Sequence, residues 1–102
     1  MGIDAVLKDE SGDVLGVVGD PRMVLSRATL SGALSGTRLL KYLVPWGDAI
    51  FNQAQAMDLE FDIADLKRTK RDPQLIDLLT KIEPLISRLS GETHSYLWFI
   101  GD

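Results

Sequence analysis

The last segment of the chain, from His94 to Asp102, constrains the fold more than any other part of the sequence. It contains five consecutive large apolar residues, Tyr96 to Ile100. Such a run is too short for a useful helix and too apolar for a loop, and it is typical of a strand covered on both faces. We therefore predict that this segment is the central strand of a sheet.

The composition predicts a single globular domain over residues 1–102. Hydrophobic residues make up 45% of the chain and charged residues 25%, which is ordinary for a protein with a packed core. The lack of cysteine excludes disulfides, thiolate metal sites and thiol catalysis. The net charge of −4 argues against nucleic-acid binding, which needs clustered cations. With neither a signal-peptide pattern nor an apolar run of about 20 residues, we expect a soluble cytoplasmic protein that binds no membrane.

The N-terminal part has the pattern of a β-hairpin over residues 3–18, with a polar turn in which Gly12 can take a positive φ. Asp20 and Pro21 then predict a helix start, because aspartate caps free amide groups and proline fits the first helical turn. We expect this helix to end near Leu30, before a flexible loop rich in serine and glycine.

The next apolar segment, residues 38–44, fits either a helix or a strand by its pattern alone. We predict a strand, because Pro45 follows at once and favours extended geometry in the residue before it. Gly47 and Asp48 then belong to a turn. Residues 49–52 form the returning strand of a second hairpin.

Residues 57–66 alternate between apolar and acidic side chains, as a strand does, but they also form two apolar stripes on a helix. We prefer the helix, because the segment continues to Arg71 without turn residues and ends in cations that suit a helix C-terminus. A helix with two apolar stripes must pack against two neighbours, and we assign the second stripe to an oligomer interface. The two stripes consist of Leu59, Ile63 and Leu66 and of Met57, Phe61 and Ala64, separated by the acidic row Asp58, Asp62 and Asp65, which is typical of a solvated surface.

The clearest helical signal follows Asp72 and Pro73, which repeat the cap-plus-proline start. Pro84 lies opposite the apolar stripe of this helix, on the expected solvent side, and Gly91 marks its end. The stripe consists of Leu75, Leu78, Leu79, Ile82, Leu85, Ile86 and Leu89. The element order β-β-α-β-β-α-α-β thus predicts an α+β fold, in which two longer helices pack on one face of a mostly antiparallel sheet of about five strands.

Few residues suggest chemistry. His94, the single histidine, has the right type of side chain for acid–base catalysis, although a lone histidine at a strand end is more often structural. We expect no metal or other cofactor, since the acidic residues lack calcium-loop spacing and no glycine-rich phosphate loop is present. An anion or nucleic-acid site is one alternative for the basic cluster Lys67–Arg71, but the cluster lacks interleaved aromatic residues in an acidic protein, and charge complementarity with the helix C-terminus accounts for it without a partner. Trp46, at the tip of a turn, is either a partner anchor or folded back over its own hairpin.

Several short motifs together resemble a family of small bacterial proteins without established activity, some of which are carried on mobile gene cassettes. The motifs are Gly47-Asp48 followed by Phe51-Asn52, and the closing pattern His-x-Tyr-Leu-x-Phe-x-Gly-Asp over 94–102. The family often has Asp-Pro-Tyr-Gly-Asp at the second hairpin, where this chain has Val44-Pro-Trp-Gly-Asp48. The resemblance implies no activity for any residue.

Two functional hypotheses follow from the residues. The first is a non-enzymatic interaction module that forms a homodimer or binds another protein, for instance as an immunity-type inhibitor of a basic toxin, because the apolar surfaces exceed what one short chain can cover. The second is a small-molecule site or enzyme with a pocket formed by Tyr42, Asp48, Asn52 and His94.

Overall fold

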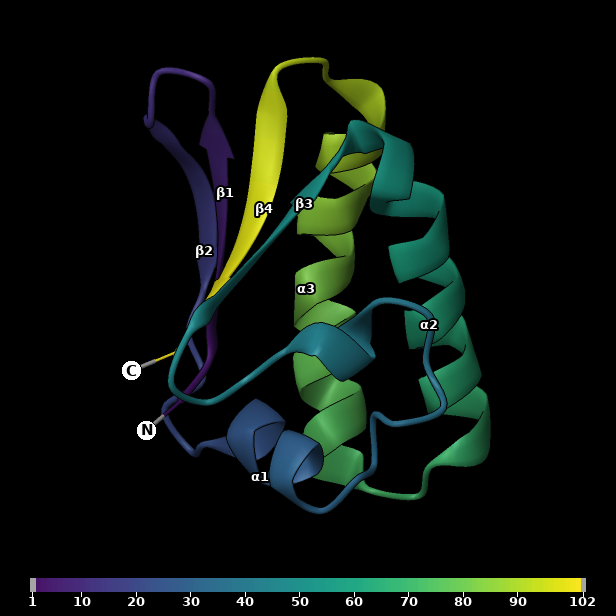
Figure 1. Cartoon of the computed structure of the whole chain (residues 1–102). Helices are drawn as coiled ribbons and strands as arrows, with labels where there is room; N and C mark the ends of the chain where they lie inside the picture. Colours follow the sequence, from purple (N-terminus) through teal and green to yellow (C-terminus); the bar gives the residue numbers. More distant parts are fainter. Residues whose placement is uncertain (1, 102) are drawn as a thin grey trace.

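A computed structural model describes residues 2–101 and has the predicted α+β architecture, with helices packed on one face of an antiparallel sheet (Figure 1). Within the described residues, the sheet has four strands in the order β2-β1-β4-β3. The strands are β1 (Asp4–Asp9), β2 (Val14–Val18), β3 (Asp48–Asn52) and β4 (Ser95–Ile100), and the helices are α1 (Val24–Leu30), α2 (Ala56–Thr69) and α3 (Pro73–Gly91). Two short 3-10 turns, η1 (Leu40–Tyr42) and η2 (Gln53–Gln55), precede β3 and α2.

The C-terminal segment forms β4, and the predicted central position is confirmed, since β4 pairs with β1 on one side and with β3 on the other. The prediction that both faces of this strand are covered is wrong within residues 2–101, where only one face is covered. Leu97 and Phe99 are buried under the helices, whereas the intervening Tyr96 and Trp98 are not fully buried. The five-residue apolar run is therefore a strand with one face in the core and an apolar outer face.

The N-terminal hairpin is confirmed, with Gly12 at φ 87° in its turn. The following helix begins later than predicted, at Val24, and its preceding residue, Met23, has φ 55°. Asp20 still acts as the predicted cap. Its buried carboxylate accepts hydrogen bonds from the amides of Val24 and Leu25 and from the amide of Ile3, so it also ties the start of β1 to α1.

The prediction of a strand at residues 38–44 is wrong. The amides of Arg38, Leu39 and Leu40 donate to the carboxylate of Asp62 at 2.8–3.1 Å, which curls this segment around the side chain instead of extending it along the sheet. Consequently β3 pairs with β4 rather than with its chain neighbour, and the described sheet has four strands instead of five.

The helix at 57–66 is confirmed as part of α2, and its first stripe, Leu59, Ile63 and Leu66, is buried. The second stripe faces outward, with Met57 78% exposed. The acidic row is not a uniform solvated surface as predicted, because Asp62 is fully buried where it binds the three amides described above.

The long helix α3 crosses the inner face of the sheet and contributes six buried residues to the core from one stripe, more than any other described element. Asp72 caps it through the amides of Gln74 and Leu75, as predicted, and Pro84 is exposed on the opposite side. At Gly16 the sheet approaches α3 so closely that an added Cβ would lie 2.6 Å from a methyl carbon of Leu85. Among the described residues, no helix is both long enough and apolar enough to cross a membrane.

Candidate functional site

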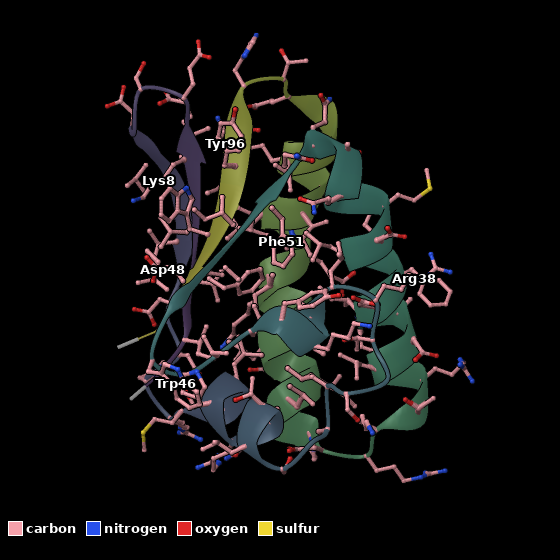
Figure 2. All side chains as sticks on the ribbon, in the orientation of Figure 1. Lys8, Arg38, Trp46, Asp48, Phe51 and Tyr96 are labelled. Carbon is pink, nitrogen blue, oxygen red and sulfur yellow. The ribbon has the colours of Figure 1, made fainter. Side chains whose placement is uncertain are left out.

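The face of the sheet that points away from the helices carries several exposed apolar residues, among them Val14, Val17 and Ile50. Side chains alternate between the two faces of each strand. Figure 2 shows Phe51 directed toward α3, where it meets Phe99 at a ring-centroid distance of 5.9 Å, and Lys8 on the opposite side. Because α1, α2 and α3 all lie on one side of the sheet (Figure 1), no helix covers the other side, which we call the outer face.

An apolar row crosses the outer face from one edge to the other. The strand register places Val17 beside Val6, Val6 beside Trp98, and Trp98 beside Ile50. Val17 at 58% exposure and Ile50 at 47% lie open to solvent at the two ends, while Val6 is shielded by its neighbours at 8%. We call these four residues the outer row. They contribute one residue from each strand of the sheet.

Polar side chains flank the outer row on both sides. On one side, the row Val14, Lys8, Tyr96 and Asn52 contains a single cation, and the Lys8 ammonium lies 4.5 Å from the ring centroid of Trp98. On the other side lie Asp4, Ile100 and Asp48, with two acids. The outer face therefore carries both signs of charge around an apolar centre, as the rim and core of a protein interface do.

The four residues of the predicted small-molecule pocket are not brought together. Asp48 and Asn52 stand at opposite ends of β3, opposite Ile100 and Tyr96 respectively. Four residue-to-residue steps along the strand separate them by roughly 13 Å. The amide of Asn52 bonds to the side chain of Gln55 in a capping box at the start of η2. This placement gives Asn52 a structural role.

His94 lies in the turn before β4, with φ 61° and a side chain 70% exposed. Its Nδ1 is 3.1 Å from a carboxylate oxygen of Glu10, across the end of the N-terminal hairpin. An exposed pair of this kind contributes little to stability and has no enclosed reaction space. Four hollows on the described surface are lined by residues other than Tyr42, Asp48, Asn52 and His94. Within residues 2–101, no three His, Asp or Glu side chains gather as a metal site would need.

Tyr42 and Trp46 lie on the segment that leads from η1 into β3. Both are exposed, Trp46 at 71%, and the Lys41 ammonium lies 5.4 Å from the Tyr42 ring. Trp46 is near the end of β3 that carries Asp48 (Figure 2). It is therefore placed at the margin of the outer face, where a large aromatic ring can extend an interface.

The second stripe of α2 lies on the helical side of the molecule. Phe61 is 48% exposed, but the Arg38 guanidinium stacks 3.7 Å from its ring centroid and is held there by an ion pair with Asp58. Ala64 lines a shallow groove of about 790 Å³ between α2 and α3. The chain itself thus partly covers this stripe at Phe61, whereas the side chain of Met57 is 78% exposed to solvent.

Sequence reasoning identified the aromatic part of the outer row in β4 but not the row itself. The four residues come from positions 6, 17, 50 and 98, and only the register of three strand pairings aligns them. The usable signal was the period-two alternation in β1 and β3, which places one apolar residue of each on the outer face.

No family model, curated protein or solved structure matches this chain. The resemblance to small bacterial cassette proteins therefore stays a prediction.

Proposed function

We propose that this protein is a non-enzymatic interaction module that self-associates through the outer face of its sheet. The observation that supports this function best is the outer row, an uninterrupted apolar band that spans all four strands with no helix above it. Contiguous apolar patches on a protein surface often mark interaction sites.

A second copy of the chain fits this face by size. Two sheets pack about 10 Å apart, and large residues pack best opposite small ones. A two-fold axis parallel to the strands, between β1 and β4, places Trp98 of each copy over the recessed Val6 of the other and Val17 over Ile50. Two Trp98 rings directly opposite each other would collide at that spacing, so this axis gives the better packing.

The low net charge of the outer face permits a like partner, although it does not by itself favour one. Its single cation, Lys8, and its two acids, Asp4 and Asp48, flank the outer row on opposite sides and give no strong excess of either sign. A strongly basic target would favour a dense acidic patch instead. A homodimer is therefore preferable to an immunity-type inhibitor. The inhibitor is the alternative in which the partner is a different protein.

The available area predicts a modest affinity. Four strands of about five residues span roughly 19 Å by 17 Å. Specific interfaces bury about 800 Å² per partner, and the roughly 320 Å² that these dimensions give in projection is well below that value, as in weak, transient interfaces. We expect a dissociation constant in the micromolar range, with Trp46 adding contact at the margin.

The second stripe of α2, Met57, Phe61 and Ala64, is the other candidate interface. It is less suitable, because Arg38 already occupies the ring of Phe61. The proposal further takes the protein to be cytoplasmic and bacterial, on the basis of its cysteine-free sequence and its resemblance to the cassette proteins.

Sedimentation velocity between about 5 and 500 μM tests the proposal with two matched variants. Val17→Asp puts a charge into the outer row at a residue 58% exposed, and Met57→Asp puts the same charge into the α2 stripe at a residue 78% exposed. Both sites tolerate a polar side chain in the folded monomer. We expect the wild type and Met57→Asp to dimerise alike and Val17→Asp to remain monomeric.

Three results would contradict the proposal. A wild-type protein that is monomeric at 500 μM has no self-association to explain. Loss of the dimer in Met57→Asp alone would move the interface to α2. An unchanged dimer in Val17→Asp, with a native circular dichroism spectrum, would exclude the outer row.

A further inference from the structure

Most lysine and arginine side chains of this acidic protein contact a carboxylate or an aromatic ring within the described residues, but four of them do not. Of the eleven Lys and Arg residues, five form ion pairs with carboxylates and two lie over aromatic rings within the described residues. Arg27, Lys70, Arg71 and Arg22 have neither kind of partner there. Three of these four line the same hollow, although they come from α1 and from the link between α2 and α3.

The hollow has a volume of about 360 Å³ and lies where α1 faces the start of α3. Val24, Ala28 and Leu75 form an apolar floor, and the cations stand around it. Its single carboxylate, Asp72, is occupied, because it caps α3 through the amides of Gln74 and Leu75. The guanidinium of Arg27 is held by the neutral side-chain oxygen of Gln74 at 3.1 Å, which positions it without cancelling its charge.

The basic cluster of the sequence divides into two parts in the structure. Lys67 pairs with Glu83, and Arg68 pairs with Asp65. Helix-terminal ion pairing thus accounts for the first half of the cluster. It leaves Lys70 and Arg71, which lie beyond the last residue of α2 and line both this hollow and a neighbouring one beside α3.

Like charges placed around one hollow repel each other unless an anion lies between them. Arginine guanidinium groups bind phosphate oxygens in a bidentate manner, and several cations on one group favour a dianion over a carboxylate. We propose that this hollow binds the phosphate group of a small phosphate monoester, with Arg27, Lys70 and Arg71 on the phosphate and the apolar floor under the attached organic group. This site is separate from the outer face of the sheet and does not depend on self-association.

Titration of isotope-labelled protein with phenyl phosphate, followed by amide and arginine NMR signals at constant ionic strength, tests the site. The variants Arg27→Gln and Arg71→Gln each remove one cation from the hollow. Arg22→Gln is the matched control, because it removes the same charge from an unpaired, exposed arginine outside this hollow. All three residues are exposed, so the fold is retained, and the amide spectrum verifies this.

We expect saturable shifts at residues 27, 31 and 70–72 with a millimolar dissociation constant. Each hollow variant should weaken binding about tenfold, as the loss of a charge-assisted hydrogen bond does, and Arg22→Gln less than twofold. Absence of saturation by about 20 mM phenyl phosphate would overturn the site. If Arg22→Gln weakened binding as much as the hollow variants, the anion would be attracted by the overall charge of the protein and the proposed site would be wrong. If benzoate bound as tightly as phenyl phosphate, the assignment to a phosphate group would be wrong.

Discussion

The two faces of the sheet are formed by the same strands but differ in how far their apolar side chains are exposed to solvent. On the inner face, Leu97, Phe99 and Phe51 are at most 4% exposed and pack under α3. On the outer face, residues one position away along the same strands, such as Ile50 at 47%, are equally apolar but open to solvent. Burial rather than hydrophobicity therefore separates the residues that hold the fold from those that are available to a partner.

The largest expected difference between the faces concerns two adjacent residues of β4, Trp98 and Phe99. Substituting each one should lower the free energy of unfolding of the protein by a different amount. Phe99→Ala removes a buried ring and should cost about 3–5 kcal/mol. Trp98→Ala, on the outer face, should cost the monomer about 1–2 kcal/mol, since part of its ring is already in water. Urea denaturation at low protein concentration measures both, and equal losses would mean that the outer face is as much part of the core as the inner one.

A second comparison concerns the two aspartates of α2 that contact the 38–44 segment. Asp62→Asn leaves a buried amide group among three backbone donors, and we expect a loss of about 2–4 kcal/mol. Asp58→Asn breaks only the exposed ion pair with Arg38 and should cost less than about 1 kcal/mol. Chemical denaturation of both variants checks this. If the two losses were equal, Asp62 would not be the anchor of the segment.

The smallest effect is expected at Lys8, which lies over Trp98 on the outer face. Lys8→Met removes a cation–π contact worth about 0.5–1 kcal/mol at exposed sites, so monomer stability should change by no more than that. The same change widens the apolar row and should tighten the dimer several-fold. Sedimentation of Lys8→Met beside Lys8→Gln, which removes the charge without adding apolar surface, separates the two effects; a weaker dimer in Lys8→Met would contradict the proposed interface.

The sequence was sufficient for features that depend on local chemistry. The caps at Asp20 and Asp72, the stripe of α3 and the terminal strand all follow from neighbouring residues, and all are present. The prediction of a strand at residues 38–44 was wrong because the backbone amides at its start donate hydrogen bonds to the carboxylate of Asp62, more than 20 positions away. No local pattern contains that information.

The candidate surface was predictable only in part for the same reason. The sequence suggested that apolar area would remain to be covered on the last strand and on the second stripe of α2, but it did not identify the residues of the other strands that complete the outer row. The outer row depends on the pairing of β4 with β1 and β3, which brings together residues up to 92 positions apart. Long-range register is the information that a single sequence lacks.

The most direct test of the account is an isotope-filtered NOE experiment on an equal mixture of labelled and unlabelled protein at about 500 μM. This measurement detects contacts between copies and ignores those within one chain. We predict intermolecular NOEs from the Trp98 ring to the methyl groups of Val6, and between Val17 and Ile50. Intermolecular NOEs confined to Met57 and Phe61 would contradict the claim that a second copy covers this face. So would a protein of dimeric mass that shows no intermolecular NOE to any residue of the outer row.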